Sequence, residues 1–118
     1  MMQWNEADVC DVLGTTAEVN GFGYNFTIAK HGLSLLLNIY PDEGDVHLVL
    51  RQDAIPDPIF ELWLIECPGM RRIQNEDGDS LEFTPTRLSG DSFGSSALDP
   101  IIVRVAVNPQ ISLSVKVF

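Results

Sequence analysis

Apolar and polar residues alternate with a period of two along most of the chain after residue 15. In a β-strand successive side chains point to opposite faces, whereas an amphipathic helix repeats its apolar residues three and four positions apart. The alternation is clearest at 101–107 and 111–117, where isoleucine, leucine or valine fills every second position. This pattern predicts a mainly β protein.

Short turn sequences separate the alternating runs. Asn20-Gly21 is the dipeptide preferred in type I′ hairpin turns, and His31-Gly32 offers a second tight turn. The stretch 53–58 must be a loop, because two prolines cannot serve a central strand. Strands are expected at 15–19, 22–30, 33–40, 46–51, 59–67, 70–75, 81–84, 101–107 and 111–117. Short links make neighbours antiparallel, so we expect an antiparallel meander folded as a sandwich or a curved half-barrel.

The first residues instead predict one short N-terminal helix. Asn5 can act as its N-cap, and Asp8 stands at the third helical position, where an acidic side chain favours a helix start. Trp4 and Val9 have the spacing of a hydrophobic staple, and Gly14 can adopt the left-handed conformation that ends a helix. We therefore expect one helix ahead of the first strand.

Length and composition favour a single β-rich domain over residues 1–118. The chain is 45% hydrophobic and 20% charged, which is ordinary for a globular protein. No apolar run approaches the roughly 18 residues that a membrane span needs. The N-terminal residues have neither the basic stretch nor the apolar core of a secretory signal. Cys10 and Cys67 lack metal-type spacing, so we expect two free thiols in a reducing cytoplasm.

The charge balance is strongly acidic, with 17 Asp and Glu against 7 Lys and Arg and a formal net charge of −10. Such a surface repels phosphate, which disfavours nucleic acid and anionic membranes as partners. It attracts a basic protein, although acidic charge can also serve solubility alone. The acidic residues of the expected turns are Asp42, Glu43, Asp45, Asp53, Asp57, Glu76, Asp77 and Asp79. If several of these turns fall at one end of the sheet, they form a patch that steers a basic partner.

The first functional hypothesis is therefore a non-catalytic interaction protein that binds a basic protein. By charge and size alone, it is similar to small acidic cytoplasmic proteins that neutralise a basic toxin or nuclease. The strand at 59–67 is apolar on both faces, so the helix, a second sheet or a partner must cover one of them. That partner could be a second copy of the chain, which leaves a homodimer open.

The second hypothesis is a β-domain that binds a carbohydrate or another small ligand. Trp63 and Tyr40 would form the stacking surface, and the long loop at 85–100 would act as a lid. Phe22 and Tyr24 are further aromatic candidates, although aromatic residues at strand spacing more often belong to the core.

The third hypothesis is a small hydrolase, because residues 90–94 read Gly-Asp-Ser-Phe-Gly. A nucleophile in this motif sits between a buried strand and a long helix, with its histidine later in the chain. Neither element is expected around Ser92, and both histidines, His31 and His47, precede it. The pattern therefore indicates a loop residue rather than a nucleophile, and no catalytic residue is predicted.

No metal or cofactor site is predicted either. Asn75, Asp77 and Asp79 resemble the start of a calcium loop, but Ser80 and Thr86 stand where its glycine and its last glutamate belong. Both histidines lack ligands at metal spacing and are expected to be structural. Glu82, between Leu81 and Phe83, is expected on a solvated face, and Arg71-Arg72 is expected to balance acidic residues across the sheet.

Overall fold

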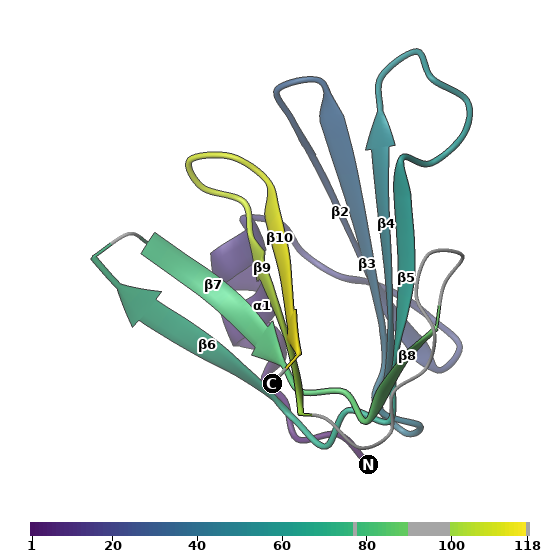
Figure 1. Ribbon diagram of the computed structural model, residues 1–118, viewed down its shortest axis with the longest axis vertical. Helices are drawn as coiled ribbons and strands as arrows, with labels where there is room; N and C mark the ends of the chain where they lie inside the picture. The colour runs from purple at the N-terminus through teal and green to yellow at the C-terminus, as the bar shows by residue number, and fades with distance from the viewer. Residues whose placement is uncertain (77, 90–99, 118) are drawn as a thin grey trace.

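The computed structural model describes residues 1–76, 78–89 and 100–117. Within them the chain forms one helix and ten strands, and the strands make two antiparallel sheets. The sheets converge at the end where the chain crosses between them and diverge at the other end (Figure 1). The mainly β sandwich with a single short N-terminal helix is confirmed. The predictions for Asp77 and for residues 90–94, including Ser92, lie outside the described residues.

The larger sheet has six strands in the order β1-β2-β3-β4-β5-β8. Its strands are β1 (Glu18–Asn20), β2 (Gly23–Lys30), β3 (Leu33–Tyr40), β4 (Asp45–Gln52), β5 (Phe60–Ile65) and β8 (Arg87–Ser89). The first five form the expected meander. Strand β8 corrects the prediction of an unbroken loop at 85–100, because Leu88 pairs with Leu64 and is buried. Because β8 has only three residues and one of them points inward, its sequence shows no apolar–polar alternation that could identify it as a strand.

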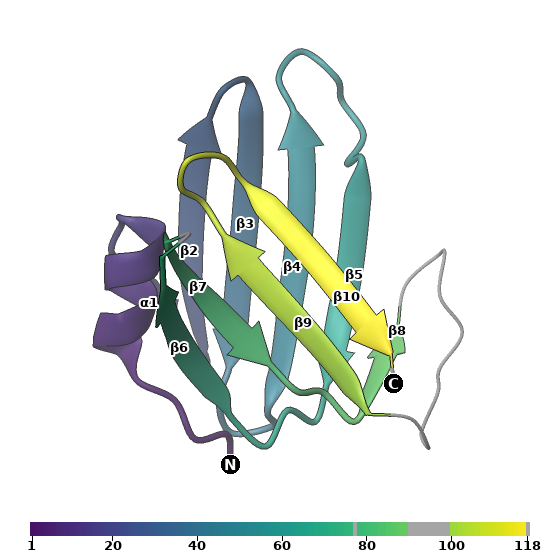
Figure 2. The same cartoon turned by 60° about the vertical axis from the view of Figure 1, so that its left-hand side comes forward.

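The smaller sheet has four strands in the order β10-β9-β7-β6. Its strands are β6 (Met70–Asn75), β7 (Gly78–Phe83), β9 (Ile101–Ala106) and β10 (Ser112–Val117). The chain crosses between the sheets after β5, after β7 and after β8. In Figure 2 the strands of this sheet cross those of the larger sheet at an angle, and the helix lies at one edge of the sandwich. The fold is thus a sandwich in which only the larger sheet is a long meander.

Helix α1 (Glu6–Leu13) has the ends that its sequence predicts. The side-chain oxygen of Asn5 accepts hydrogen bonds from the backbone N–H groups of Ala7 and Asp8, and Gly14 ends the helix with a φ of 71°. These local bonds satisfy groups that a helix end leaves open. The helix packs against β6 and β7 and buries Val9, Val12 and Leu13.

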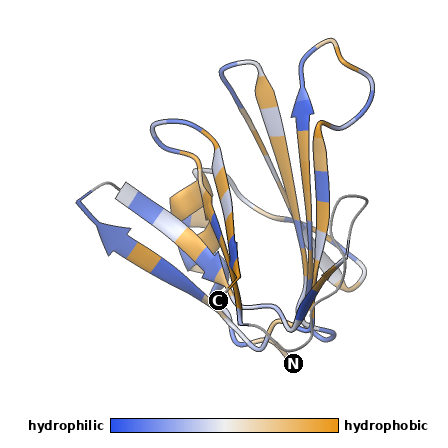
Figure 3. Ribbon diagram, viewed as in Figure 1, coloured by the Kyte–Doolittle hydropathy of each residue, from blue (hydrophilic) through white to orange (hydrophobic). Residues whose placement is uncertain are grey.

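One hydrophobic core lies between the two sheets and the helix. Its fully buried side chains come from alternate positions of strands in both sheets. They include Phe26, Leu37, Leu62, Leu81, Phe83 and Val103. Figure 3 shows hydrophobic and hydrophilic residues interspersed along these strands. The period-two prediction of inward residues is therefore confirmed, and the opposite faces of both sheets point outward.

Two hairpin turns differ in type, and one corrects a prediction. Pairing of Asn20 with Gly23 leaves Gly21 and Phe22 in the turn, and of these only Gly21 has a positive φ, of 58°. That is the pattern of a type II′ turn rather than the expected type I′ turn centred on Asn20-Gly21. His31 and Gly32 have positive φ values of 53° and 79°, as a type I′ turn requires.

Candidate functional site

The outer face of the larger sheet carries a row of three stacked rings, which we call the aromatic row: Tyr40, His47 and Trp63. His47 and Trp63 are direct cross-strand partners on β4 and β5, and their ring centroids are 4.2 Å apart with an interplanar angle of 15°. The Tyr40 ring, from the end of β3, stacks on Trp63 at 5.9 Å and 22°. All three rings are partly exposed. The two residues predicted to form a stacking surface are therefore brought together, with His47 added.

Gly23 makes room for this row. A Cβ atom at Gly23 would lie 2.8 Å from Cε1 of Tyr40, which is closer than real Cβ contacts allow. The tyrosine ring therefore lies over the backbone of β2, the neighbouring strand. The absence of a side chain at Gly23 thus sets the position of one end of the row.

Polar groups surround His47 on the same face. Its Nδ1 is 3.3 Å from the side-chain amide nitrogen of Asn38, on β3, and its Nε2 is 3.6 Å from a carboxylate oxygen of Glu61, on β5. Only 17% of the His47 side chain is exposed, and within the described residues Nε2 makes no hydrogen bond. Val49 and Leu36 form an apolar area beside it, since the register pairs them directly with each other. The outward position of His47 was predicted, but its contact with Trp63, the central ring of the row, depends on the pairing register.

Three of the predicted acidic residues lie at one end of the aromatic row. Asp42 and Glu43 are exposed in the turn that follows Tyr40, and Asp45 is the cross-strand partner of Tyr40. A carboxylate oxygen of Asp45 also accepts a hydrogen bond of 3.1 Å from the backbone N–H of Glu66. Asp45 therefore stabilises the chain after β5 and adds negative charge beside Tyr40.

The other predicted acidic residues lie elsewhere. Asp53 and Asp57 are in the loop between β4 and β5, at the opposite end of β4, because successive turns of a meander alternate between the two ends (Figure 1). Glu76 and Asp79 belong to the β6–β7 hairpin of the smaller sheet, where Asp79 binds the guanidinium of Arg72. The acidic turns therefore do not form one patch, and only the group at 42–45 adjoins the predicted stacking residues.

A second aromatic surface, which we call the aromatic corner, lies near the N-terminus. Trp4 meets Tyr24 edge to face, with ring centroids 4.9 Å apart. A cavity of about 330 Å³ opens there, and 78% of Phe22 is exposed at its edge. The cavity is lined by Met1, Trp4, Val19, Gly21, Phe22, Tyr24, Pro41 and Asp42. Tyr24 and Phe22 therefore do not belong to the surface formed by Tyr40 and Trp63.

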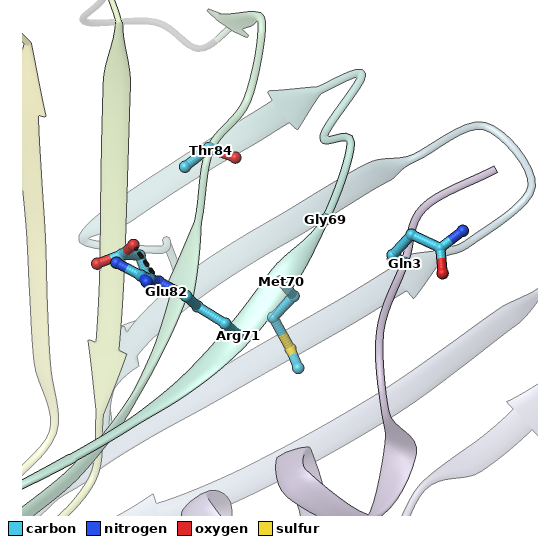
Figure 4. Close-up of a pocket in the computed structure, with 6 residues that line it drawn as sticks. All are labelled: Gln3, Gly69, Met70, Arg71, Glu82 and Thr84. Atoms are coloured by element: carbon cyan, nitrogen blue, oxygen red, sulfur yellow. Dashed lines mark hydrogen bonds and ion pairs between the residues drawn. The ribbon is translucent and has the colours of Figure 1, made fainter.

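Glu82 lies on the outer face of the smaller sheet, and its predicted solvation is wrong. Only 3% of its side chain is exposed, and its two oxygens accept hydrogen bonds of 2.8 Å from Arg71 Nε and 3.0 Å from Arg104 Nε. Burial alone would raise the pKa of Glu82, but the bonds from Arg71 and Arg104 outweigh it and lower that pKa. Figure 4 shows the Arg71 side chain extending toward Glu82 while Met70 points away.

The expected balance between arginine and acidic residues is confirmed by this cluster. Arg71, Glu82 and Arg104 are successive cross-strand partners on β6, β7 and β9. A cavity of about 240 Å³ adjoins the cluster and is lined by Gln3, Gly69, Met70, Arg71, Glu82 and Thr84. Each guanidinium binds Glu82 through Nε, and the side chains of Arg71 and Arg104 are 71% and 44% exposed.

The described residues contain no group of three or more His, Cys, Asp or Glu that could hold a metal ion. Nor is any helix in the described part of the chain long and apolar enough to cross a membrane. Both cysteines are free, and Cys67 is buried.

Comparison with known proteins shows a likeness in fold over almost the full length of the chain. No protein-family model matches the sequence, and no curated protein matches it. The chain is similar to a chain of the contact-dependent growth inhibition toxin–immunity protein complex from Klebsiella pneumoniae 342, with a TM-score of 0.81. The likeness covers 99% of this chain and 97% of that chain, at 11% sequence identity. At this identity the comparison shows a shared fold.

Proposed function

We propose that this chain is a non-catalytic protein that binds a basic protein and neutralises it, as an immunity protein does. The observation that carries the proposal is the likeness over almost the full length of both chains to part of a toxin–immunity protein complex. A shared fold does not by itself establish a shared function. The acidity of the chain supports the proposed binding of a basic protein independently of the fold. A net charge of −10 on 118 residues favours rapid capture of a positively charged protein.

The compartment that fits this function is the cytoplasm. Both cysteines are free, and unpaired thiols are typical of reducing compartments. A protein that intercepts a toxin inside the cell would act there.

Protection from growth inhibition is the test of this function. The polypeptide encoded beside this chain would be expressed alone and together with it. We expect the partner to be basic, to inhibit growth alone and to lose its toxicity on co-expression. The purified pair should form an equimolar complex that weakens from about 0.1 M to about 1 M salt, where the screening length falls from roughly 10 Å to roughly 3 Å. Continued growth inhibition in the presence of the folded chain would refute the proposal.

A sugar-binding function remains the second candidate, on the strength of the aromatic row. Tyr40 and Trp63 are partly exposed on one face, as a stacking surface needs. Their rings stack on each other and on His47, however, so ring faces that a sugar would use are already covered. A saturable change of tryptophan fluorescence with one sugar, lost in Trp63→Ala, would favour this candidate. We expect no such change.

A further inference from the structure

We infer that the basic partner docks on the outer face of β3, β4 and β5, with cationic side chains against Tyr40 and Trp63, and that the outer face of the smaller sheet stays free. This inference rests on the proposed function and adds the surface and the contact chemistry to it. It is supported by the charge of the two outer faces, by the exposure of Glu61 and the rings, and by the stacking of the aromatic row.

The two outer faces differ in charge. On the described strands of the smaller sheet, the outward positions carry Arg71, Arg104 and Lys116, which are three of the 7 basic residues of the chain. The one acidic residue at these positions is Glu82, and two arginines already neutralise it. A chain with a net charge of −10 therefore has one locally positive face, which repels a basic protein.

The outer face of the larger sheet has the opposite character around the aromatic row. Glu61 is half exposed beside His47, and Asp42, Glu43 and Asp45 lie at the Tyr40 end. Two arginines also lie on this face. Arg51, at the far end of β4, donates a hydrogen bond to the carbonyl oxygen of Pro56 in the β4–β5 loop, and the exposed Arg87, on β8, is the cross-strand partner of Ile65. Around the rings, the acidic residues at 42, 43, 45 and 61 still outnumber the one nearby cation, Arg87.

The aromatic row also has the composition of an interface centre. Tryptophan and tyrosine are enriched among the residues that contribute most to protein–protein affinity, because they bury a large apolar area at a low entropic cost. Leu36 and the buried Val49 extend this apolar area along the sheet. A lysine or arginine of the partner could pack its methylene stem on the exposed part of the Trp63 side chain and place its charge beside the Glu61 carboxylate. Apolar and acidic groups thus converge on one surface that suits a basic partner.

A matched pair of charge reversals tests the docking face. Glu61→Lys and Glu76→Lys change the net charge of the chain equally, and both residues are exposed. Glu61 adjoins the aromatic row, whereas Glu76 is in the β6–β7 turn of the smaller sheet. Titration of the purified neighbouring gene product should show dissociation constants raised at least about 30-fold by Glu61→Lys, as at an interface hot spot, and at most about 3-fold by Glu76→Lys.

Ring variants provide a second test that does not depend on charge. Trp63→Ala should weaken binding at least about 30-fold, and Trp63→Phe less, because a ring remains over the face. Phe22→Ala, at the aromatic corner, serves as the control and should leave affinity within about 3-fold. Thermal unfolding of each variant separates loss of binding from loss of fold.

The possible outcomes separate the docking face from the function. The docking face would be wrong if Glu61→Lys and Glu76→Lys had equal effects on affinity, or if Phe22→Ala had a larger effect than Trp63→Ala. Either result would still show a complex and would leave the proposed function intact. If the wild-type chain does not bind the neighbouring gene product, the function fails for that partner. A hexa-arginine peptide titrated against the same variants then still tests the face, and equal weak binding to all of them would overturn it.

Discussion

Two buried acidic groups, Glu82 and Cys67, differ in how the fold treats their charge. Glu82 keeps its negative charge because Arg71 and Arg104 bind both of its oxygens. Burial, and to a lesser extent the nearby Asp45 carboxylate, raises the pKa of Cys67 to about 12, and no cation among the described residues offsets this rise. We therefore expect Glu82 to be ionised and Cys67 to be a neutral thiol in the folded protein near neutral pH.

Replacement of Glu82 by glutamine should destabilise the protein in a pH-dependent way. The lowered pKa in the folded state means that ionised Glu82 stabilises the fold above its unfolded pKa of about 4.3. At about pH 7 we expect Glu82→Gln to lower the free energy of unfolding by about 1–3 kcal/mol, with the difference shrinking as the pH falls below about 4. Urea unfolding at several pH values measures this. A pH-independent difference, or an equal loss in the exposed control Glu76→Gln, would contradict the role of the two arginines.

Cys67 should resist thiol reagents in the folded protein. Its side chain is 2% exposed, and its raised pKa leaves almost no thiolate at about pH 8. In the variant Cys10→Ser, a thiol-specific disulfide reagent should react with Cys67 only after urea is added. Reaction of the folded variant at the rate of the unfolded one would show that Cys67 is accessible and ionised.

At the residue scale, the sequence predicts which way many side chains point but not what they meet. Alternation predicts an outward Glu82, and its face is indeed the outer one. Its burial arises from Arg71 and Arg104, which are 11 and 22 residues away in the chain. Only the strand order places them beside it, and alternation carries no information about strand order.

The turn between β3 and β4 is the element that connects the candidate site to the rest of the fold. Gly44 has a φ of 76°, and its backbone N–H donates to the carbonyl oxygen of Tyr40. Its carbonyl oxygen accepts a hydrogen bond of 2.7 Å from the N–H of Cys67, just after β5. The turn thus fixes Tyr40 and Asp45 relative to the end of β5.

Alanine at Gly44 should therefore cost more than alanine at another glycine with positive φ. Both Gly44→Ala and Gly32→Ala force an L-residue into the left-handed region, at about 1–2 kcal/mol. At Gly44 the new Cβ would also lie 2.8 Å from the carbonyl oxygen of Cys67, whereas at Gly32 nothing lies within 4 Å. Urea unfolding should show Gly44→Ala to be the less stable variant by at least about 1 kcal/mol. Equal stabilities would mean that the close approach to Cys67 is unimportant.

At the element scale, the predictable parts are those with local causes. Helix α1 depends on Asn5 and Gly14, both of which act within their own turn of chain. Strand β8 depends on pairing of residues 87–89 with β5, which lies more than twenty residues earlier in the sequence. Its own short segment carries no local signal of a strand, so the sequence predicted a loop there.

For the whole molecule, one shared core predicts cooperative unfolding. The two sheets and α1 contribute to the same cluster of buried residues, so we propose that 1–118 is one folding unit. Trp4 near the helix and Trp63 on β5 report on different parts of it. Tryptophan fluorescence and far-ultraviolet circular dichroism should give the same urea midpoint. Separate midpoints would indicate two units.

The charge of the whole molecule was predicted from composition, but its distribution was not. The sequence shows which turns are acidic. The predicted acidic patch depended on several of these turns lying at one end of the sheet. The fold instead separates the turn at 41–44 from the loop at 53–59 by the length of β4. It also gathers Arg71, Arg104 and Lys116 on one face. The sidedness that underlies the proposed docking face therefore appears only in three dimensions.

The two tryptophans allow the most direct measurement of that sidedness. The chain has 2 tryptophans: Trp63 lies in the aromatic row and Trp4 in the aromatic corner. In nitrogen-15-labelled protein, each indole N–H gives its own nuclear magnetic resonance signal. When the basic partner is titrated in, we expect the Trp63 signal to shift or broaden in step with complex formation while the Trp4 signal stays in place. A complex that moves the Trp4 signal and leaves that of Trp63 unchanged would contradict docking on the outer face of β3 to β5.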